Sequence, residues 1–137
     1  MQDRIPPDFD ATPRDDVLVV RLDLAHVGLP EIERLREPLL RLASGDPPRL
    51  LLDLAAVDYL CSAAVGVILG MSRRTVERGG RLVLCNLRPV VLETFVPMPR
   101  HQALRPDWPG PFFARSLEEG LALCGGQRSV RPLGGDA

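Results

Sequence analysis

The sequence contains no lysine, because all 17 of its basic residues are arginine. Without lysine the chain can form neither a Walker A phosphate loop nor a lysine Schiff base with a carbonyl substrate. Its acidic residues number 18, which gives a net charge of −1 at pH 7. A chain of such balanced charge lacks the basic surface by which proteins attach to nucleic acid or to an anionic membrane. These absences argue against P-loop enzymes and against nucleic-acid partners.

Cysteine is scarce, and the three cysteines are widely spaced with no CxxC pair: Cys61, Cys85 and Cys124. This odd number and spacing predict neither a disulfide framework nor a zinc site, and they fit a reducing cytoplasm. The two histidines, His26 and His101, are far apart and have no ligand spacing around them. We therefore expect no metal and no cofactor.

Long hydrophobic runs are also missing. The longest one covers residues 63–71, whereas a membrane-spanning helix needs roughly 20 apolar residues. The N-terminal residues 1–8 are acidic and rich in proline, without the apolar region of a signal peptide. The sequence thus predicts a cytoplasmic protein that does not insert into membranes.

Hydrophobic residues make up 45% of the 137 positions and charged residues 26%, as in one globular domain. Their periodicity predicts strands over 17–24, 50–54 and 82–85 and helices over 30–43, 62–78 and 89–95, followed by a helix that Ser116 and Glu119 cap ahead of Cys124. A last short strand near residues 112–113 has a weaker signal. This order implies right-handed crossovers around a small, mostly parallel sheet, an α/β domain.

Two of the predicted helices carry further expectations. Pro38 lies inside the first helix and is expected to kink or split it, at a cost of about 3 kcal/mol. The second helix is expected to bury a stripe formed by Val65, Ile68, Leu69 and Val76. Its arginines, Arg73, Arg74 and Arg78, are expected to face water, where they either dock an acidic partner or are simply solvated.

The boundaries of the domain follow from the loss of periodicity at both ends. We expect a mobile segment over residues 1–15, the folded domain over 16–124 and a mobile tail over 125–137. The proline-rich connection 97–111 cannot form a regular helix. Three aromatic side chains are expected to hold this part of the chain to the domain by burying their area: Trp108, Phe112 and Phe113.

The candidate site lies in residues 53–66, which lead from a buried strand into the second helix. In parallel sheets, ligands and switches lie at such carboxyl ends of strands. Ser62 falls where the helix begins, and two interpretations of it stay open. Its hydroxyl only caps N–H groups of the helix, or it accepts a phosphate, which the helix dipole stabilises and which presents a charge of about −2 to a partner.

The segment VDYLCSAAVGVILG over residues 57–70, the segment GGRLVLCN over 79–86 and Pro89 together resemble the STAS domain. More narrowly, they resemble the bacterial anti-sigma factor antagonists. These proteins have a hydrophobic strand, an Asp-Ser-Ser/Ala-Gly-Leu-Gly-type turn, a helix, a Gly-Gly-x-Leu strand and a helix that starts with proline. The resemblance extends over roughly residues 16–124 and implies a STAS-like α/β fold.

The resemblance also implies a function without catalysis, called partner switching. The unphosphorylated antagonist binds an anti-sigma factor, usually a serine kinase, and so frees a sigma factor; phosphorylation breaks the complex and a phosphatase restores it. Ser62 occupies the phosphoacceptor position of the motif. We expect the partner surface to surround it and to follow the exposed face of the second helix: Cys61, Ala63, Gly66, Leu69 and Arg73.

Two alternatives remain open from the residues themselves. Cys61 at a helix N-terminus, with His26 within reach, would suit a reactive or redox-sensing thiol, although a cysteine packed as a small hydrophobe is commoner. The other alternative is a STAS module that works without phosphorylation, as an accessory subunit or a small-ligand sensor. It is favoured by Cys61, which replaces the usual Asp, and by residues 24–27, which lack the family's acidic Gly-Glu-Leu-Asp-like segment.

Overall fold

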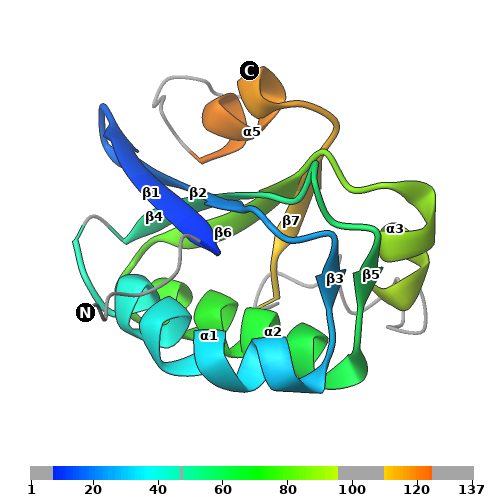
Figure 1. Cartoon of the computed structure of the whole chain (residues 1–137). Helices are drawn as coiled ribbons and strands as arrows, with labels where there is room; N and C mark the ends of the chain where they lie inside the picture. Colours follow the sequence, from blue (N-terminus) through cyan, green and yellow to red (C-terminus); the bar gives the residue numbers. More distant parts are fainter. Residues whose placement is uncertain (1–7, 47, 96–109, 125–137) are drawn as a thin grey trace.

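Five strands build the central sheet, in the spatial order β1-β2-β4-β6-β7 (Figure 1). The computed structural model describes residues 8–46, 48–95 and 110–124. The strands of this sheet are β1 (Phe9–Arg14), β2 (Val17–Leu22), β4 (Arg49–Asp53), β6 (Arg81–Cys85) and β7 (Phe112–Ala114). All neighbouring strands are parallel except β1, which is antiparallel to β2. A separate pair, β3 (His26–Val27) and β5 (Tyr59–Leu60), is also parallel.

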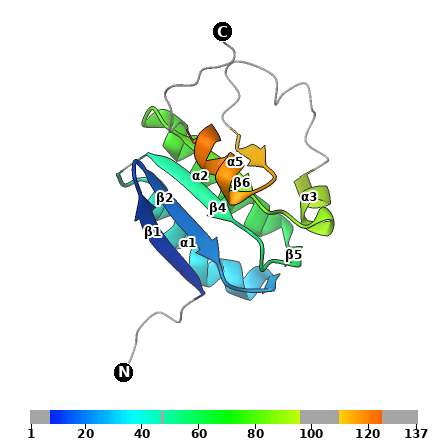
Figure 2. The ribbon, with the colours of Figure 1, turned by 90° about the horizontal axis from the view of Figure 1, so that it is seen from above.

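The helices divide between the two faces of the sheet. Helices α1 (Leu29–Ala43) and α2 (Ser62–Glu77) lie side by side on one face, and α5 (Leu117–Leu123) covers the other (Figures 1 and 2). Helix α3 (Pro89–Phe95) lies beside β5. The larger part of the core fills the space between the sheet and α1 with α2, and a smaller cluster lies under α5. The prediction of an α/β domain around a small, mostly parallel sheet is confirmed.

The central strand β4 shows why the sheet is stable. Its three leucines, Leu50, Leu51 and Leu52, are completely buried. Leu50 and Leu52 point to the α1 and α2 side, whereas Leu51 points to the α5 side. Burying each such side chain contributes about 1.5–3 kcal/mol. The uniformly apolar run is thus the pattern of a parallel strand that is covered on both faces.

The prediction of a mobile segment over residues 1–15 is wrong for residues 9–14, which form β1. This strand pairs with β2 from Phe9, opposite Leu22, to Arg14, opposite Val17. It has no alternating pattern because it is an edge strand that is exposed along almost its whole length. Phe9 alone packs against the larger core cluster. Residues 1–7 and 125–137, which are most of the rest of the predicted mobile parts, lie outside the described residues.

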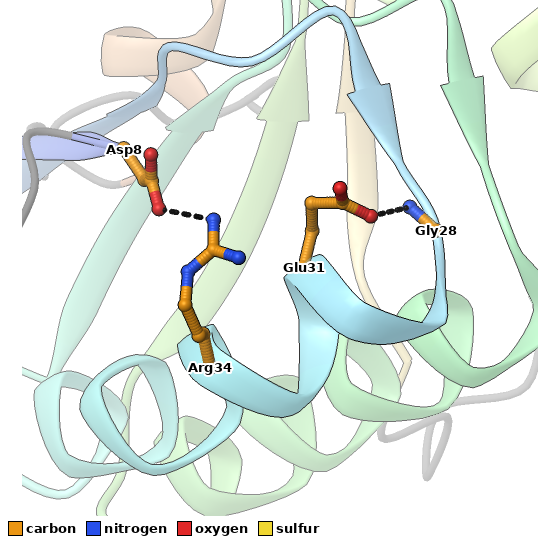
Figure 3. A network of polar contacts seen from close by, with 4 residues as sticks. All are labelled: Asp8, Gly28, Glu31 and Arg34. Carbon is orange, nitrogen blue, oxygen red and sulfur yellow. Dashed lines mark hydrogen bonds and ion pairs between the residues drawn. The ribbon is translucent and has the colours of Figure 1, made fainter.

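Helix α1 is continuous through Pro38, so the expected split does not occur. Leu35 and Leu39 on either side of the proline are buried, and their packing holds the two halves in one helix. The start of α1 is fixed by Glu31, whose Oε1 accepts a hydrogen bond from the N–H of Gly28 at 3.0 Å (Figure 3). One turn further on, the Nη2 of Arg34 donates to Asp8 at 2.7 Å and ties α1 to the chain before β1.

The buried face of α2 differs from the predicted stripe. Ile68 is buried as expected, but Val65 and Leu69 are half-buried and Val76 is 38% exposed. The buried residues are instead mostly small or polar: Ala64, Ile68, Met71, Ser72 and Thr75. Thr75 can be buried because its hydroxyl donates to the carbonyl of Ser72 at 2.8 Å. The predicted apolar stripe is therefore out of phase, because the inner face of this helix combines the large apolar side chains of Ile68 and Met71 with small or polar residues.

The short strand predicted near residues 112–113 is present as β7, but its aromatic side chains are not buried. Phe112 is 36% and Phe113 38% exposed. The guanidinium of Arg81 lies 4.9 Å from the centre of the Phe112 ring, and Phe113 meets Phe95 edge to face at 5.5 Å. These contacts hold β7 through ring faces and edges rather than through full burial. Trp108 and most of the connection 97–111 lie outside the described residues.

Candidate functional site

Ser62 is the first residue of α2 and lies exposed at the carboxyl edge of the sheet. The chain reaches it from β4 through a loop and the short strand β5. The pairing of β5 with β3 fixes this approach, since Cys61 donates its N–H to the carbonyl of Val27 at 3.0 Å and Asp58 donates to Ala25 at 2.7 Å. The position of Ser62 therefore depends on the segment that leads into α1 as well as on its own helix.

A second set of contacts holds the loop between β4 and β5. Asp53 accepts two hydrogen bonds on Oδ1, from the N–H of Ala55 at 3.0 Å and from Nδ2 of Asn86 at 3.1 Å. Arg88 donates from Nε to the carbonyl of Ala55 at 3.1 Å, and its Nη1 lies 3.2 Å from a carboxylate oxygen of Asp58. The residues that follow β6 thus fasten the loop before Ser62. Because the ion pair between Arg88 and Asp58 is exposed, it contributes little to the free energy of folding and mainly orients the loop.

The interpretation of Ser62 as a cap of α2 is wrong. The N-cap residue is Cys61, and its side chain makes no capping hydrogen bond. Within the described residues, the Ser62 hydroxyl has no hydrogen bond, and the first turn of α2 carries no acidic side chain. The cap moves by one residue because β5 keeps Cys61 extended, with φ −77° and ψ 167°. An exposed hydroxyl therefore stands at the positive end of a helix dipole that no carboxylate of its first turn neutralises.

An aromatic pair lies on the approach to Ser62. The rings of His26 and Tyr59 stack with their centres 4.7 Å apart and an angle of 20° between their planes. Tyr59 is 46% exposed, and Leu29 at the start of α1 is 54% exposed. We call these three residues, His26, Tyr59 and Leu29, the apolar patch. No pattern in the sequence indicates this surface, because the two rings meet only through the parallel pairing of the two-residue strands β3 and β5.

The residues predicted to bind a partner occupy different environments. Ala63, Gly66 and Arg73 are exposed and line a groove of about 570 Å³ between α1 and α2. Cys61 and Leu69 are half-buried and do not line the groove, and Cys61 packs against the larger core cluster. The structure thus brings Ala63, Gly66 and Arg73 to one surface. The other wall of that surface comes from α1, which the sequence analysis did not include.

The thiols offer no catalytic arrangement in the part of the chain that the structure describes. His26, the candidate partner of Cys61, stacks on Tyr59. Burial raises the pKa of Cys124 to about 12 and that of Cys85 to about 12 as well. Both side chains belong to the small core cluster under α5. Over residues 8–46, 48–95 and 110–124, no group of three or more acidic, histidine or cysteine side chains could hold a metal ion.

The sequence profile of the STAS domain family matches residues 8–101, more than half of the 137 residues. The chain belongs to the STAS domain family. An anti-sigma factor antagonist STAS domain protein from Planctomyces limnophilus has a similar structure, with a TM-score of 0.64 and 23% identity over 85% of this chain and 97% of that one. The unphosphorylated form of the anti-sigma factor antagonist SpoIIAA gives a TM-score of 0.64 at 21% identity over 87% and 97% of the two chains.

The similarity found by comparing sequences alone extends over fewer residues than the structural similarities. A putative anti-sigma factor antagonist, BtrV of Bordetella bronchiseptica, is 43% identical over 47 residues. The matched stretch spans 34% of this STAS chain and 40% of that relative. Among the helices that the structure describes, none has the length and apolar character to cross a membrane. The family membership predicted from residues 57–70 and 79–86 is confirmed.

Proposed function

We propose that this STAS protein is an anti-sigma factor antagonist that works by partner switching under the control of Ser62. Its unphosphorylated form binds an anti-sigma factor in the cytoplasm, and the sigma factor that this partner had held is released. The proposal is supported by the family and by the antagonists that resemble the chain, one of which is the phosphorylated form of SpoIIAA. The protein would act by binding alone, and a serine kinase and a phosphatase would set its state.

The observation that carries the proposal is the exposed hydroxyl of Ser62 at the first position of α2. It caps no helix, so phosphorylation would cost the fold no hydrogen bond among the described residues. A phosphate there would be stabilised by the dipole of a helix of 16 residues. The fold can therefore carry either state of Ser62, as a reversible switch requires.

The apolar patch gives the switch a physical effect on binding. Its members His26, Tyr59 and Leu29 are the first residues of β3, β5 and α1, and Tyr59 precedes Ser62 by three residues, so a partner that covers them would come close to Ser62. A neutral hydroxyl is easily desolvated, whereas a phosphate with a charge of about −2 is not. Such a charge at an interface edge costs several kcal/mol through desolvation and repulsion. Phosphorylation would thus release the partner.

The test is phosphate transfer from ATP by purified serine kinases of the anti-sigma factor class from the source organism. We expect one phosphate per chain, located on Ser62 by peptide mass spectrometry, and none on Ser62→Ala. Ser44→Ala is the matched control, because Ser44 is also exposed but follows α1. Transfer that continues in Ser62→Ala would refute the role of Ser62. A chain that no kinase phosphorylates, but that binds a regulatory assembly, would instead be an accessory STAS module, which Cys61 in place of Asp favours.

A further inference from the structure

The groove between α1 and α2 begins beside Ser62, where Ala63 and Leu29 line it, and follows both helices away from Ser62. The two helices start at the same end of the molecule and run in the same direction (Figure 1). The α2 wall carries small residues, Ala63, Gly66 and Gly70. A Cβ added at Gly66 would have no atom within 4 Å. Space above the helix is therefore open where a partner's side chains could enter.

One contact shows which residues of α1 and α2 face each other across the groove. A Cβ at Gly70 would lie 3.4 Å from a methyl group of Leu40, so these two positions face each other across the groove. One turn nearer to Ser62 on each helix, Arg36 lies across from Gly66. Arg73 lies seven residues beyond Gly66 on α2, which is about 10 Å along the helix axis. The backbone positions of Arg36 and Arg73 are thus about two helical turns apart along the groove.

The charges of the groove favour an acidic occupant. Its lining carries the arginines Arg36, Arg73 and Arg74 against the glutamates Glu33 and Glu77. Arg74 donates to the Ser44 hydroxyl at 3.0 Å. Arg36 and Arg73 form no ion pair with any residue that the structure describes, whereas Arg34, Arg41, Arg78 and Arg88 all do. Two exposed arginines of the groove therefore form no ion pair within the described residues.

We propose that this groove binds an amphipathic helix of the protein partner, with its apolar face on Ala63 and Gly66 and with two carboxylates about two turns apart that meet Arg36 and Arg73. An open channel between two helices fits the side of a third helix, because ridges of side chains pack into such grooves. The inference rests on the proposed function in so far as the partner is a regulatory protein. It adds a second contact surface, which shares Leu29 with the apolar patch.

The test uses two synthetic helical peptides and the full chain labelled with ¹⁵N. Both peptides carry alanine and leucine on one face; one has glutamates spaced by seven residues and the other has lysines there. We expect the glutamate peptide to shift the amide signals of residues 29–40 and 63–74 and to bind at least about tenfold more tightly than the lysine peptide. In the double variant Arg36→Glu/Arg73→Glu this preference is expected to reverse.

A control variant makes the same change of charge elsewhere. Arg14→Glu/Arg21→Glu alters two exposed arginines on β1 and β2, outside the groove, and should keep the preference for glutamate. Absence of binding, or a preference unaffected by Arg36→Glu/Arg73→Glu, would overturn the groove proposal. So would a dimer, measured by sedimentation without peptide, that the same variant dissociates, because the occupant would then be a second copy. These results are independent of the test of the proposed function, which measures phosphorylation of Ser62.

Discussion

Substitution of Gly66 by alanine is expected to stabilise the protein. Gly66 lies inside the 16-residue helix α2, and a Cβ at this position would meet no atom within 4 Å. The new methyl group therefore causes no clash and gains no packing, so only helix propensity changes. Glycine inside a helix is less favourable than alanine by about 0.5–1 kcal/mol. For a domain of this size, that gain raises the melting temperature by about 2–5 °C.

The assay is thermal unfolding followed by far-ultraviolet circular dichroism, with Gly80→Ala as the opposite case. A Cβ at Gly80 would lie 1.7 Å from the carbonyl oxygen of Pro48, which is backbone and cannot swing aside. We expect Gly80→Ala to destabilise the fold by about 1–3 kcal/mol, the usual cost of overpacking. A lower melting temperature for Gly66→Ala would refute the reasoning, because it would mean that the space above Gly66 is filled within the chain itself.

Four further results are expected. Arg88→Ala removes the hydrogen bond to the carbonyl of Ala55, so hydrogen exchange of the amides in residues 54–60 should become faster. Exchange in α5 should be unchanged. If residues 54–60 exchange at the same rate in the variant and in the wild type, Arg88 does not hold the loop. Ser116→Ala removes the N-cap of α5 and should lower the free energy of unfolding, measured by urea titration, by about 1 kcal/mol. An unchanged free energy of unfolding would show that this capping hydrogen bond does not stabilise the protein. At pH 7 an alkylating agent should modify Cys61 alone, as counted by intact mass, because Cys124 is buried and burial raises its pKa to about 12. Since thiols titrate near 9.0 in the unfolded chain, stability should also fall as pH rises from about 9 toward 12; a stability constant over that range would contradict the shift.

The parts of the fold that could be predicted are those with long, uniform patterns. The run of leucines in β4 and the capping pair of Ser116 and Glu119 each determine their structure within a few residues. Strand β1 could not be found, because an exposed edge strand needs no apolar alternation and takes its conformation from its neighbour β2. The strands β3 and β5 have two residues each, and only their mutual pairing makes them strands.

In the candidate site too, the features set by the local sequence could be predicted, whereas those set by contacts between distant segments could not. The sequence was sufficient to place Ser62 at the start of α2, because the motif and the helix pattern coincide there. The shift of the cap to Cys61 depends on β5, and the stack of His26 on Tyr59 depends on a pairing between segments far apart in the chain. The groove likewise needs Arg36 from α1 to lie across from Gly66 of α2, which no pattern within one helix can indicate.

The control of partner binding by Ser62 is measured by comparing the affinity of two forms of the protein for the same anti-sigma factor. One form is unphosphorylated and the other carries a phosphate on Ser62, and each is titrated into the purified partner by isothermal calorimetry. Our expectation is that the phosphate weakens binding by about 100-fold or more, equivalent to about 3 kcal/mol. Equal affinities of the two forms would contradict it, because the charge on Ser62 would then have no influence on the partner.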